Sequence, residues 1–288
     1  MGNALKTALL LGALTGLLVG LGYVIGGSGM ALIALVFAGV LNFAAYWFSD
    51  KLALKMSGAR EVTREEAPEL HSVVDEIATL AGVPKPRVYI VENESPNAFA
   101  TGRNPEHAAV AATTGIMRIL DRRELRAVIG HEIGHVKNRD ILTSSIAATI
   151  AGAISYLQTM LMWGSLLGGG RRDGGGNLMI AFVASIVAAF AAVMLQMALS
   201  RTREFAADKS GAEYTHDPEA LASALGKLHN GVQTRPMQQN AGSEATSSLY
   251  IVHPFRAGAG LSNLFSTHPP VEERIKRLRR MAGYVDIQ

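Results

Sequence analysis

The stretch "VIGHEIGHVKNRDILTSSIAATIAGAISYL", residues 128–157, sets the architecture of this chain, because it places a polar motif directly before a long apolar run. The motif consists of His131, Glu132 and His135, and the apolar run begins at residue 141. Two histidines and a glutamate at this spacing are typical of a metal site, whereas an apolar run of this length is typical of a membrane-spanning helix. The sequence therefore predicts a metal site at the mouth of a membrane span.

The composition indicates a membrane protein, since 49% of the 288 residues are hydrophobic and only 18% are charged. Four runs lack Lys, Arg, Asp and Glu, and each is near the roughly 20 residues that a helix needs to cross a bilayer. These runs are residues 8–25, 30–48, 141–163 and 178–199. Buried helices of a large soluble protein are also apolar all round, but the charged blocks 49–140 and 200–288 are too short to cover four of them.

The basic residues predict the topology of the four spans. Most of those that flank the runs fall on one side, which the positive-inside rule makes cytoplasmic. They are Lys6, Lys51, Lys55, Arg60, Lys137, Arg139, Arg201 and Arg203. Arg171 and Arg172 oppose this orientation from the loop between the last two runs, and Asp173 partly offsets them. We expect a multi-pass protein of the cytoplasmic (inner) membrane, with both charged blocks in the cytosol.

Three other interpretations fit the sequence less well: a cleaved signal peptide, a disulfide-stabilised protein and a nucleic-acid-binding protein. A cleaved signal peptide is disfavoured, because no A-x-A-like site follows the first run and a second run begins almost at once. The absence of cysteine excludes a disulfide framework and fits a reducing compartment. A net charge of +3 is too small and too spread out to indicate a nucleic-acid-binding protein.

The first charged block reads as a helix, a small sheet and a second helix. Residues 67–82 carry apolar residues at helical spacing and end in glycine. Asp121 and Glu124 form a capping-box pattern, so a helix that carries the metal motif is expected at 121–138. Short strands separated by turn-rich segments are expected at residues 87–92, 97–102 and 108–115.

The second charged block is expected to be helical at both ends. Between the two ends, residues 231–249 are polar and without periodicity, which predicts either a mobile lid or a disordered connector. The expected helices are residues 203–214, 217–230 and 268–281.

The chemistry of the motif follows from its spacing on a helix. His131 and His135 are four residues apart, so both imidazoles project from one face and can bind one tetrahedral zinc ion. Glu132 lies about 100° further round, where its carboxylate can act as general base on a water molecule that the metal activates. A surface helix with two solvated histidines is the simpler alternative. The apolar neighbours of the motif argue against that alternative, because they predict burial.

A catalytic zinc ion needs a third protein ligand. The extended pattern with a third histidine is excluded, because Asn138 and Ile141 stand where it requires glycine and histidine. Glu204 is the better choice, since it follows the fourth run as closely as the histidines precede the third, and an antiparallel hairpin brings both ends together. Asp208, four residues later, can accept a hydrogen bond from a ligating histidine. Alternatively, both acids lie on an exposed helix and pair with Arg201 and Arg203.

These segments together resemble one known family. The motifs are HEIGHVKNRD, a helical hairpin, then REFAAD, with NAFATG upstream and THPP near the end. In this combination, and across essentially the whole chain, the sequence is similar to the HtpX group of membrane zinc metalloproteases, which is related to the CAAX prenyl protease.

The resemblance implies one zinc ion per chain and a role for each motif residue. His131, His135 and Glu204 would be the zinc ligands and Glu132 the catalytic base, with Asp208 supporting a ligand from outside. His268 would donate to the oxyanion, and Arg274 is a weaker candidate for that work. Four residues would form an edge strand that pairs with substrate backbone beside the zinc: Asn97, Ala98, Phe99 and Ala100. Without the resemblance, Asn97 is as well explained by a turn and His268 by a helix start.

We therefore predict a mainly α membrane protein with four transmembrane helices and a cytosolic, zincin-like α+β metalloprotease domain that contains a small β-sheet. Residues 1–48 are two N-terminal spans, 49–140 the first half of the protease domain with the HExxH helix, 141–199 a transmembrane hairpin, and 200–288 the second half with the third zinc ligand. The resemblance implies an endopeptidase that cleaves misfolded or damaged membrane proteins under stress. Two alternatives are a processing protease of the prenyl type and a non-catalytic scaffold stabilised by zinc.

Overall fold

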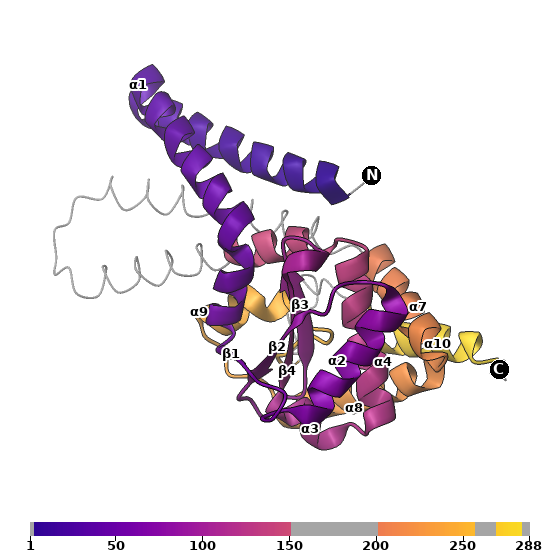
Figure 1. Cartoon of the computed structure of the whole chain (residues 1–288). Coiled ribbons are helices and arrows are strands. Elements are labelled where there is room, and N and C mark those ends of the chain that lie inside the picture. The colour runs from indigo at the N-terminus through magenta and orange to yellow at the C-terminus, as the bar shows by residue number, and fades with distance from the viewer. Residues whose placement is uncertain (1–2, 151–200, 257–268, 284–288) are drawn as a thin grey trace.

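The structure is a computed structural model of the chain, and it describes residues 3–150, 201–256 and 269–283. These residues are mostly helical and contain one small mixed sheet, which confirms that part of the predicted fold. Figure 1 shows helix α1 extending away from a body in which the other helices gather around the sheet.

Helix α1 (Asn3–Met56) consists of two helices joined by a sharp bend. The bend lies at Gly26 (φ −146°, ψ 23°) and Gly27 (φ 68°, ψ −157°), and the conformation of Gly27 is one that residues with a Cβ avoid. The two halves meet at an apex in Figure 1, and the second half runs down to the sheet. The first two predicted spans fall on either side of this bend. The second half continues to Met56, beyond the span boundary predicted at residue 48.

Among the described residues, one helix is long and apolar enough to cross a membrane: Gly26–Met56, with a mean hydropathy of 2.0 in its most apolar window. Shorter apolar helices cover Thr7–Gly20 and Ile141–Ile150. The remainder of the third predicted span and nearly all of the fourth lie outside the described residues.

Polar side chains join the apolar helices to one another. Asn42 Nδ2 donates to Thr15 Oγ1 at 2.8 Å, which links the two halves of α1. The hydroxyls of Thr7 and Thr143 are 2.9 Å apart and buried, which links α1 to the helix that begins at Ile141. Polar groups on apolar helices pair in this way because lipid offers no alternative partner. The N-terminal helices and the start of the third run therefore pack as one unit.

The sheet has the strand order β1-β2-β4-β3, so β3 is an edge strand. Strands β2 and β4 are parallel, and the other two pairs are antiparallel. The strands are β1 (Ala59–Glu61), β2 (Arg87–Val91), β3 (Ala98–Gly102) and β4 (Ala108–Thr113). The three predicted strands are confirmed. Strand β1 was missed because three residues carry no periodic pattern.

The end of β4 differs from the prediction, because the strand stops at Thr113 instead of reaching residue 115. The Thr113 side chain accepts a hydrogen bond from the backbone of Ile116 and so caps a short helix, α3 (Thr114–Ile119). A single 3₁₀ turn, η1 (Pro105–His107), joins β3 to β4.

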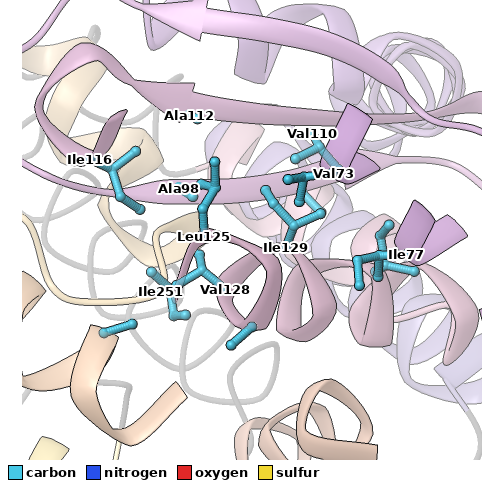
Figure 2. Packing of buried hydrophobic residues seen from close by; sticks show 14 of the residues in the cluster. Val73, Ile77, Ala98, Val110, Ala112, Ile116, Leu125, Val128, Ile129 and Ile251 are labelled. Carbon is cyan, nitrogen blue, oxygen red and sulfur yellow. The ribbon is translucent and has the colours of Figure 1, made fainter. Parts of the chain in front are cut away.

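Helices cover one face of the sheet. The covering helices are α2 (Pro68–Ala81), which ends at the left-handed Gly82, and α4 (Arg122–Lys137). Figure 2 shows the buried side chains between these helices and the strands. The labelled residues are Val73, Ile77, Ala98, Val110, Ala112, Ile116, Leu125, Val128, Ile129 and Ile251. Both helices were predicted, and the alternation of side chains along the strands explains the packing.

The opposite face of the sheet packs against the end of α1 and a C-terminal segment. Phe99, whose neighbours in β3 point to the other face, belongs to this second cluster. Ala53 and Leu54 come from α1, and Met237 and Tyr250 come from beyond α8. The last turns of the apolar helix α1 are therefore part of the core of the body.

The second charged block is more ordered than predicted. The expectation of a loop or connector over residues 231–249 is wrong, because α8 continues to Thr234 and a capping box at Asn240 starts α9. Polar side chains that cap their own backbone create this order, and they leave no apolar period to detect. The elements are α7 (Arg201–Thr215), α8 (Pro218–Thr234), α9 (Ala241–Thr246), η2 (Ser247–Leu249) and α10 (Val271–Met281).

The bend in α1 makes a prediction about stability. Gly27→Ala should lower the free energy of unfolding by about 1–3 kcal/mol, because alanine at φ 68°, ψ −157° is strained. Gly29→Ala is the matched control, since a Cβ there meets nothing within 4 Å and the backbone is not left-handed. Unfolding of both variants in mixed micelles with rising dodecyl sulfate, followed by circular dichroism, measures the difference. Equal stability of the two variants would contradict this reading of the bend.

Candidate active site

A capping box fixes the start of helix α4, which carries the motif. Asp121 accepts a hydrogen bond from the Glu124 backbone at 2.9 Å, and Glu124 accepts one from the Asp121 backbone at 3.0 Å. This capping box was predicted and is confirmed. Further along the helix, His131 is 0% and Glu132 is 1% exposed, while His135 is only partly buried. The alternative of two solvated histidines is therefore excluded.

A seam of small residues lets α7 lie very close to α4. A Cβ added to Gly211 of α7 would lie 2.7 Å from the backbone nitrogen of His131 and 3.1 Å from the carbonyl carbon of Gly130. A Cβ on Gly134 of α4 would lie 3.1 Å from Ser210 Cβ. No larger residue fits between the backbones at Gly211, so this seam sets the distance between the two helices.

The seam brings Glu204 of α7 to the two histidines. His131 Nε2 and His135 Nε2 are 3.2 Å apart. Glu204 Oε2 lies 3.7 Å from the first of these nitrogens, and Glu204 Oε1 lies 3.5 Å from the second. Ligands about 2.0–2.1 Å from a tetrahedral zinc ion are separated by about 3.4 Å. The three donor groups therefore have a spacing that suits one tetrahedral metal ion.

Each histidine ring has a carboxylate next to its Nδ1 atom, and this contact turns its Nε2 atom toward Glu204. His131 Nδ1 lies 2.9 Å from Asp208 Oδ1, and His135 Nδ1 lies 3.3 Å from Asp140 Oδ2. A ring that donates its Nδ1 proton presents the lone pair of Nε2 to the interior. The sequence suggested such a partner in Asp208. It gave no indication of Asp140, which reaches His135 only because the chain turns through the left-handed Arg139.

Arg274 has a larger part in the site than the sequence analysis gave it, which was that of a weaker candidate for donating to the oxyanion. It is 0% exposed and donates to both oxygens of Asp208, at 2.9 and 2.6 Å, and to the carbonyl of Ile251 at 2.8 Å. It therefore holds the carboxylate that orients His131. One signal was available in the sequence: Arg274 stands at helical spacing between Val271 and Leu278, on the face of α10 that packs on the core.

Glu132 has the surroundings of a general base. One oxygen of its carboxylate accepts from the backbone N–H of Ala100, and Oε1 is buried without a hydrogen-bond partner among the described residues. Burial raises the pKa of Glu132 to about 7, and the nearby Glu204 carboxylate adds to the rise. A base with this pKa takes up and releases protons near neutral pH. Oε1, which has no hydrogen-bond partner among the described residues, can accept that proton.

Burial and the surrounding charges shift the pKa values of the two histidines in opposite directions. Burial lowers the pKa of His131 to about 4, although Asp208 opposes the shift. Burial also acts to lower the pKa of His135, but the carboxylates of Glu204 and Asp140 outweigh it and raise that pKa to about 9. The facing Nε2 atoms of the two rings are 3.2 Å apart, so they cannot both carry a proton. The site thus attracts positive charge, and a divalent cation can supply it.

The four residues expected to bind substrate do not all face this site. Ala100 lines the same cavity as Glu132, on the edge strand β3. Asn97 is fully buried, and its side-chain amide donates to the carbonyl of Val252 at 2.6 Å. The carbonyl of Ala98 accepts from the backbone of Ile251 at 3.0 Å. Phe99 points to the opposite face of the sheet, where its ring lies against Tyr250. His268 lies outside the described residues.

Three ligand groups that converge from two helices, with a buried carboxylate beside them, can bind a metal ion and move a proton from water. Hydrolases that use a metal ion to activate water have this combination of groups. The fold and the site therefore define a metal-dependent hydrolase.

Comparison with known proteins identifies the family. The sequence profile described as Peptidase family M48 matches residues 64–282, so the chain belongs to this family of metalloproteases. Among its relatives, a protein named "Protease HtpX homolog" from Syntrophobacter fumaroxidans is 49% identical over 285 residues, which cover 98% of this chain and 100% of the relative. Its counterpart in Persephonella marina is 52% identical, covering 97% and 98%. The one in Pyrococcus furiosus is 51% identical, covering 98% and 97%.

The family membership confirms the HtpX resemblance, and with it a metalloprotease that acts on protein substrates. One helix apolar and long enough to cross a bilayer, in a chain that HtpX homologues match over nearly their whole length, indicates a membrane-associated enzyme. The buried group of His131, His135 and Glu204 is the candidate metal site among the described residues.

The glycine seam makes a prediction about metal binding. Gly211→Ala should lower the affinity for zinc by about tenfold or more, because its Cβ collides with the His131 backbone and moves Glu204 away from the histidines. Gly226→Ala is the matched control, since its Cβ would meet only Ile275 Cδ1 at 3.8 Å. Competition with a fluorescent chelator measures both affinities. Unchanged affinity in Gly211→Ala would show that the seam does not set the ligand spacing.

Proposed function

We propose that the chain is a zinc-dependent endopeptidase in which His131, His135 and Glu204 hold the ion. The observation that carries the proposal is the set of separations between the three donor groups, 3.2, 3.5 and 3.7 Å, which suits one tetrahedral ion. The absence of cysteine is consistent with a site made of nitrogen and oxygen ligands. Asp208, held by Arg274, and Asp140 keep the two rings oriented.

Glu132 is proposed as the general base. When bound, the ion polarises the scissile carbonyl and acidifies a water molecule. Glu132 takes a proton from that water and passes it to the leaving amine, so no covalent enzyme intermediate is needed. Its pKa of about 7 supports this role, as does Oε1, which is buried without a hydrogen-bond partner in the part of the chain that the structure describes. The same oxygen counts against a non-catalytic scaffold, because a structural metal site has no use for it.

The proposed location is the cytoplasmic membrane, with four spans and the active site in the cytosol. The exposed apolar surface of α1 supports a lipid environment for this helix. Near the C-terminal end of α1, Tyr46 and Trp47 are exposed, and Tyr and Trp are the residues expected at a membrane surface. The guanidinium of Arg103 lies 4.8 Å from the Trp47 ring, so the β3–β4 turn lies close to the same level.

The proposed domain organisation is a single protease domain assembled from residues 49–140 and 200–288, with 1–48 and 141–199 in the membrane. The contacts between α4 and α7 and a core cluster that draws on both blocks support this arrangement. The metal site itself needs both blocks, since α4 supplies two ligands and α7 the third.

The proposed substrates are misfolded or damaged membrane proteins. A site at the start of a membrane hairpin is close to such chains where they leave the bilayer. An edge strand that includes Ala98 and Ala100 binds the substrate through its backbone and so tolerates many side chains. Recognition of substrates through their backbone suits the cleavage of many different proteins better than the cleavage of one lipidated peptide.

Replacing the base tests the enzymatic proposal. Glu132→Gln should reduce cleavage of a destabilised membrane protein by about 10²–10⁴-fold, because the amide cannot accept the proton, while bound zinc stays unchanged. Glu213→Gln, the same change at an exposed position of α7, is the control. Cleavage is followed by gel electrophoresis, and zinc by mass spectrometry. Undiminished cleavage by Glu132→Gln would end the proposal in this form.

The absence of cysteine allows a direct test of topology. In intact cells, a membrane-impermeant maleimide should label Arg171→Cys from outside, and it should label Glu213→Cys only after the membrane is opened. The reason is that four spans place residues 164–177 outside and both charged blocks inside. Labelling of Glu213→Cys in intact cells would contradict a cytosolic active site.

A further inference from the structure

The outer edge of β3 is already occupied by the chain itself. On this edge, the carbonyl of Ala98 accepts from the Ile251 backbone at 3.0 Å, and the N–H of Ala100 bonds to the Glu132 carboxylate. The N–H of Gly102 points to the hydroxyl of Ser145 at 3.5 Å. A substrate that pairs with this edge needs the same backbone groups, so it has to displace a bond that the chain makes to itself.

Residues Ser247–Val252, here called the strap, make the contact at Ala98. Asn97 bonds to both backbone groups of Val252, donating to its carbonyl at 2.6 Å and accepting from its N–H at 3.2 Å. The ring of Tyr250 packs edge-on against Phe99, with centroids 5.1 Å apart. The strap is therefore bound to β3 by both backbone and side chains, as an added strand would be.

The strap also limits the space at the metal site. The cavity that contains His131, Glu132 and Glu204 has a volume of about 20 Å³, and Ser248 to Ile251 form one of its walls. A cavity of this size holds about one water molecule. As formed by the described residues, it admits the water that hydrolysis consumes but not a peptide.

A much larger hollow lies on the other side of Tyr250. It has a volume of about 550 Å³, and its walls come from the end of α1, the β2–β3 loop and the segment before α9. Tyr250 lines both spaces. The hydroxyl of Ser95 in the hollow and that of Ser248 in the cavity are buried without a hydrogen-bond partner among the described residues. Both spaces thus offer polar groups that suit a polypeptide backbone.

We infer that the strap occupies the peptide-binding edge of the sheet, and that an extended polypeptide binds only by displacing it, filling the catalytic cavity together with the polar hollow behind Tyr250. This inference rests on the proposed function, because it concerns the path of the substrate to the metal site. The exchange replaces the bond between Ile251 and Ala98 with one from the substrate backbone. The resting enzyme is closed, and a chain with unpaired backbone groups opens it.

A reversible cross-link tests the inference. Ala98→Cys with Ile251→Cys places a cysteine pair on two residues whose backbones are bonded and whose side chains share one core cluster. No other cysteine competes for the disulfide. The reduced full-length variant should cleave β-casein, an unfolded polypeptide, and the oxidised form should cleave it at least tenfold more slowly with the same zinc content. The Ala98→Cys single variant is the control for the oxidant alone: its own rate of cleavage should be the same before and after oxidation.

The outcomes separate the two proposals. Equal cleavage by the oxidised and reduced forms would overturn the strap inference, since the strap would then be closed in an active enzyme. Absence of cleavage by both the unaltered protein and the reduced variant would count against the proposed function instead.

Hydrogen exchange provides a second test that needs no change in the strap. In full-length Glu132→Gln, the amides of Ile251 and Val252 are bonded and should exchange slowly. Binding of β-casein, verified by co-sedimentation, should speed their exchange severalfold and leave α8 unchanged. Unchanged or slower exchange at the strap in the complex would overturn the inference even if the cysteine variant failed to fold.

Discussion

The close approach of α4 and α7 is the constraint on which the active site depends. Two of the proposed ligands come from one helix and the third from another, and the residues between them in the sequence include a predicted membrane hairpin. Gly130 faces Gly211 by backbone alone, and Gly134 faces Ser210. This close approach of the two helices lets Glu204 reach both imidazoles. Each further polar contact depends on this distance. Asp208 reaches His131 from the same helix, and Arg274 reaches Asp208 from α10.

The same body joins the candidate metal site to the apolar helix α1. The last turns of α1 pack on one face of the sheet, and α4 packs on the other, so the edge strand lies between the membrane helix and the metal ligands. The strap belongs to this arrangement, since Tyr250 packs with the residues of α1 while Ile251 packs with those of α4. A movement of the strap therefore affects the catalytic cavity and the hollow at the end of α1 together.

Much of the fold and the site could be predicted from the sequence, because local patterns determine them. The helix of the metal motif has its own capping box, and the hairpin topology led to Glu204 and Asp208. The parts that escaped prediction depend on contacts distant in sequence. Asp140 reaches His135 through a left-handed turn, Arg274 is buried because Asp208 neutralises it, and residues 240–252 are ordered by Asn97, Met56 and their own caps. None of these contacts leaves a periodic pattern.

The central claim is that two imidazoles of α4 and one carboxylate of α7 share a single ion. Zinc K-edge X-ray absorption of the full-length protein in detergent tests it most directly. The account predicts one zinc per chain, nitrogen and oxygen neighbours at about 2.0–2.1 Å, and outer-shell scattering from two imidazole rings. A spectrum that requires one or three imidazoles, or protein purified without chelators that contains no metal, would contradict it.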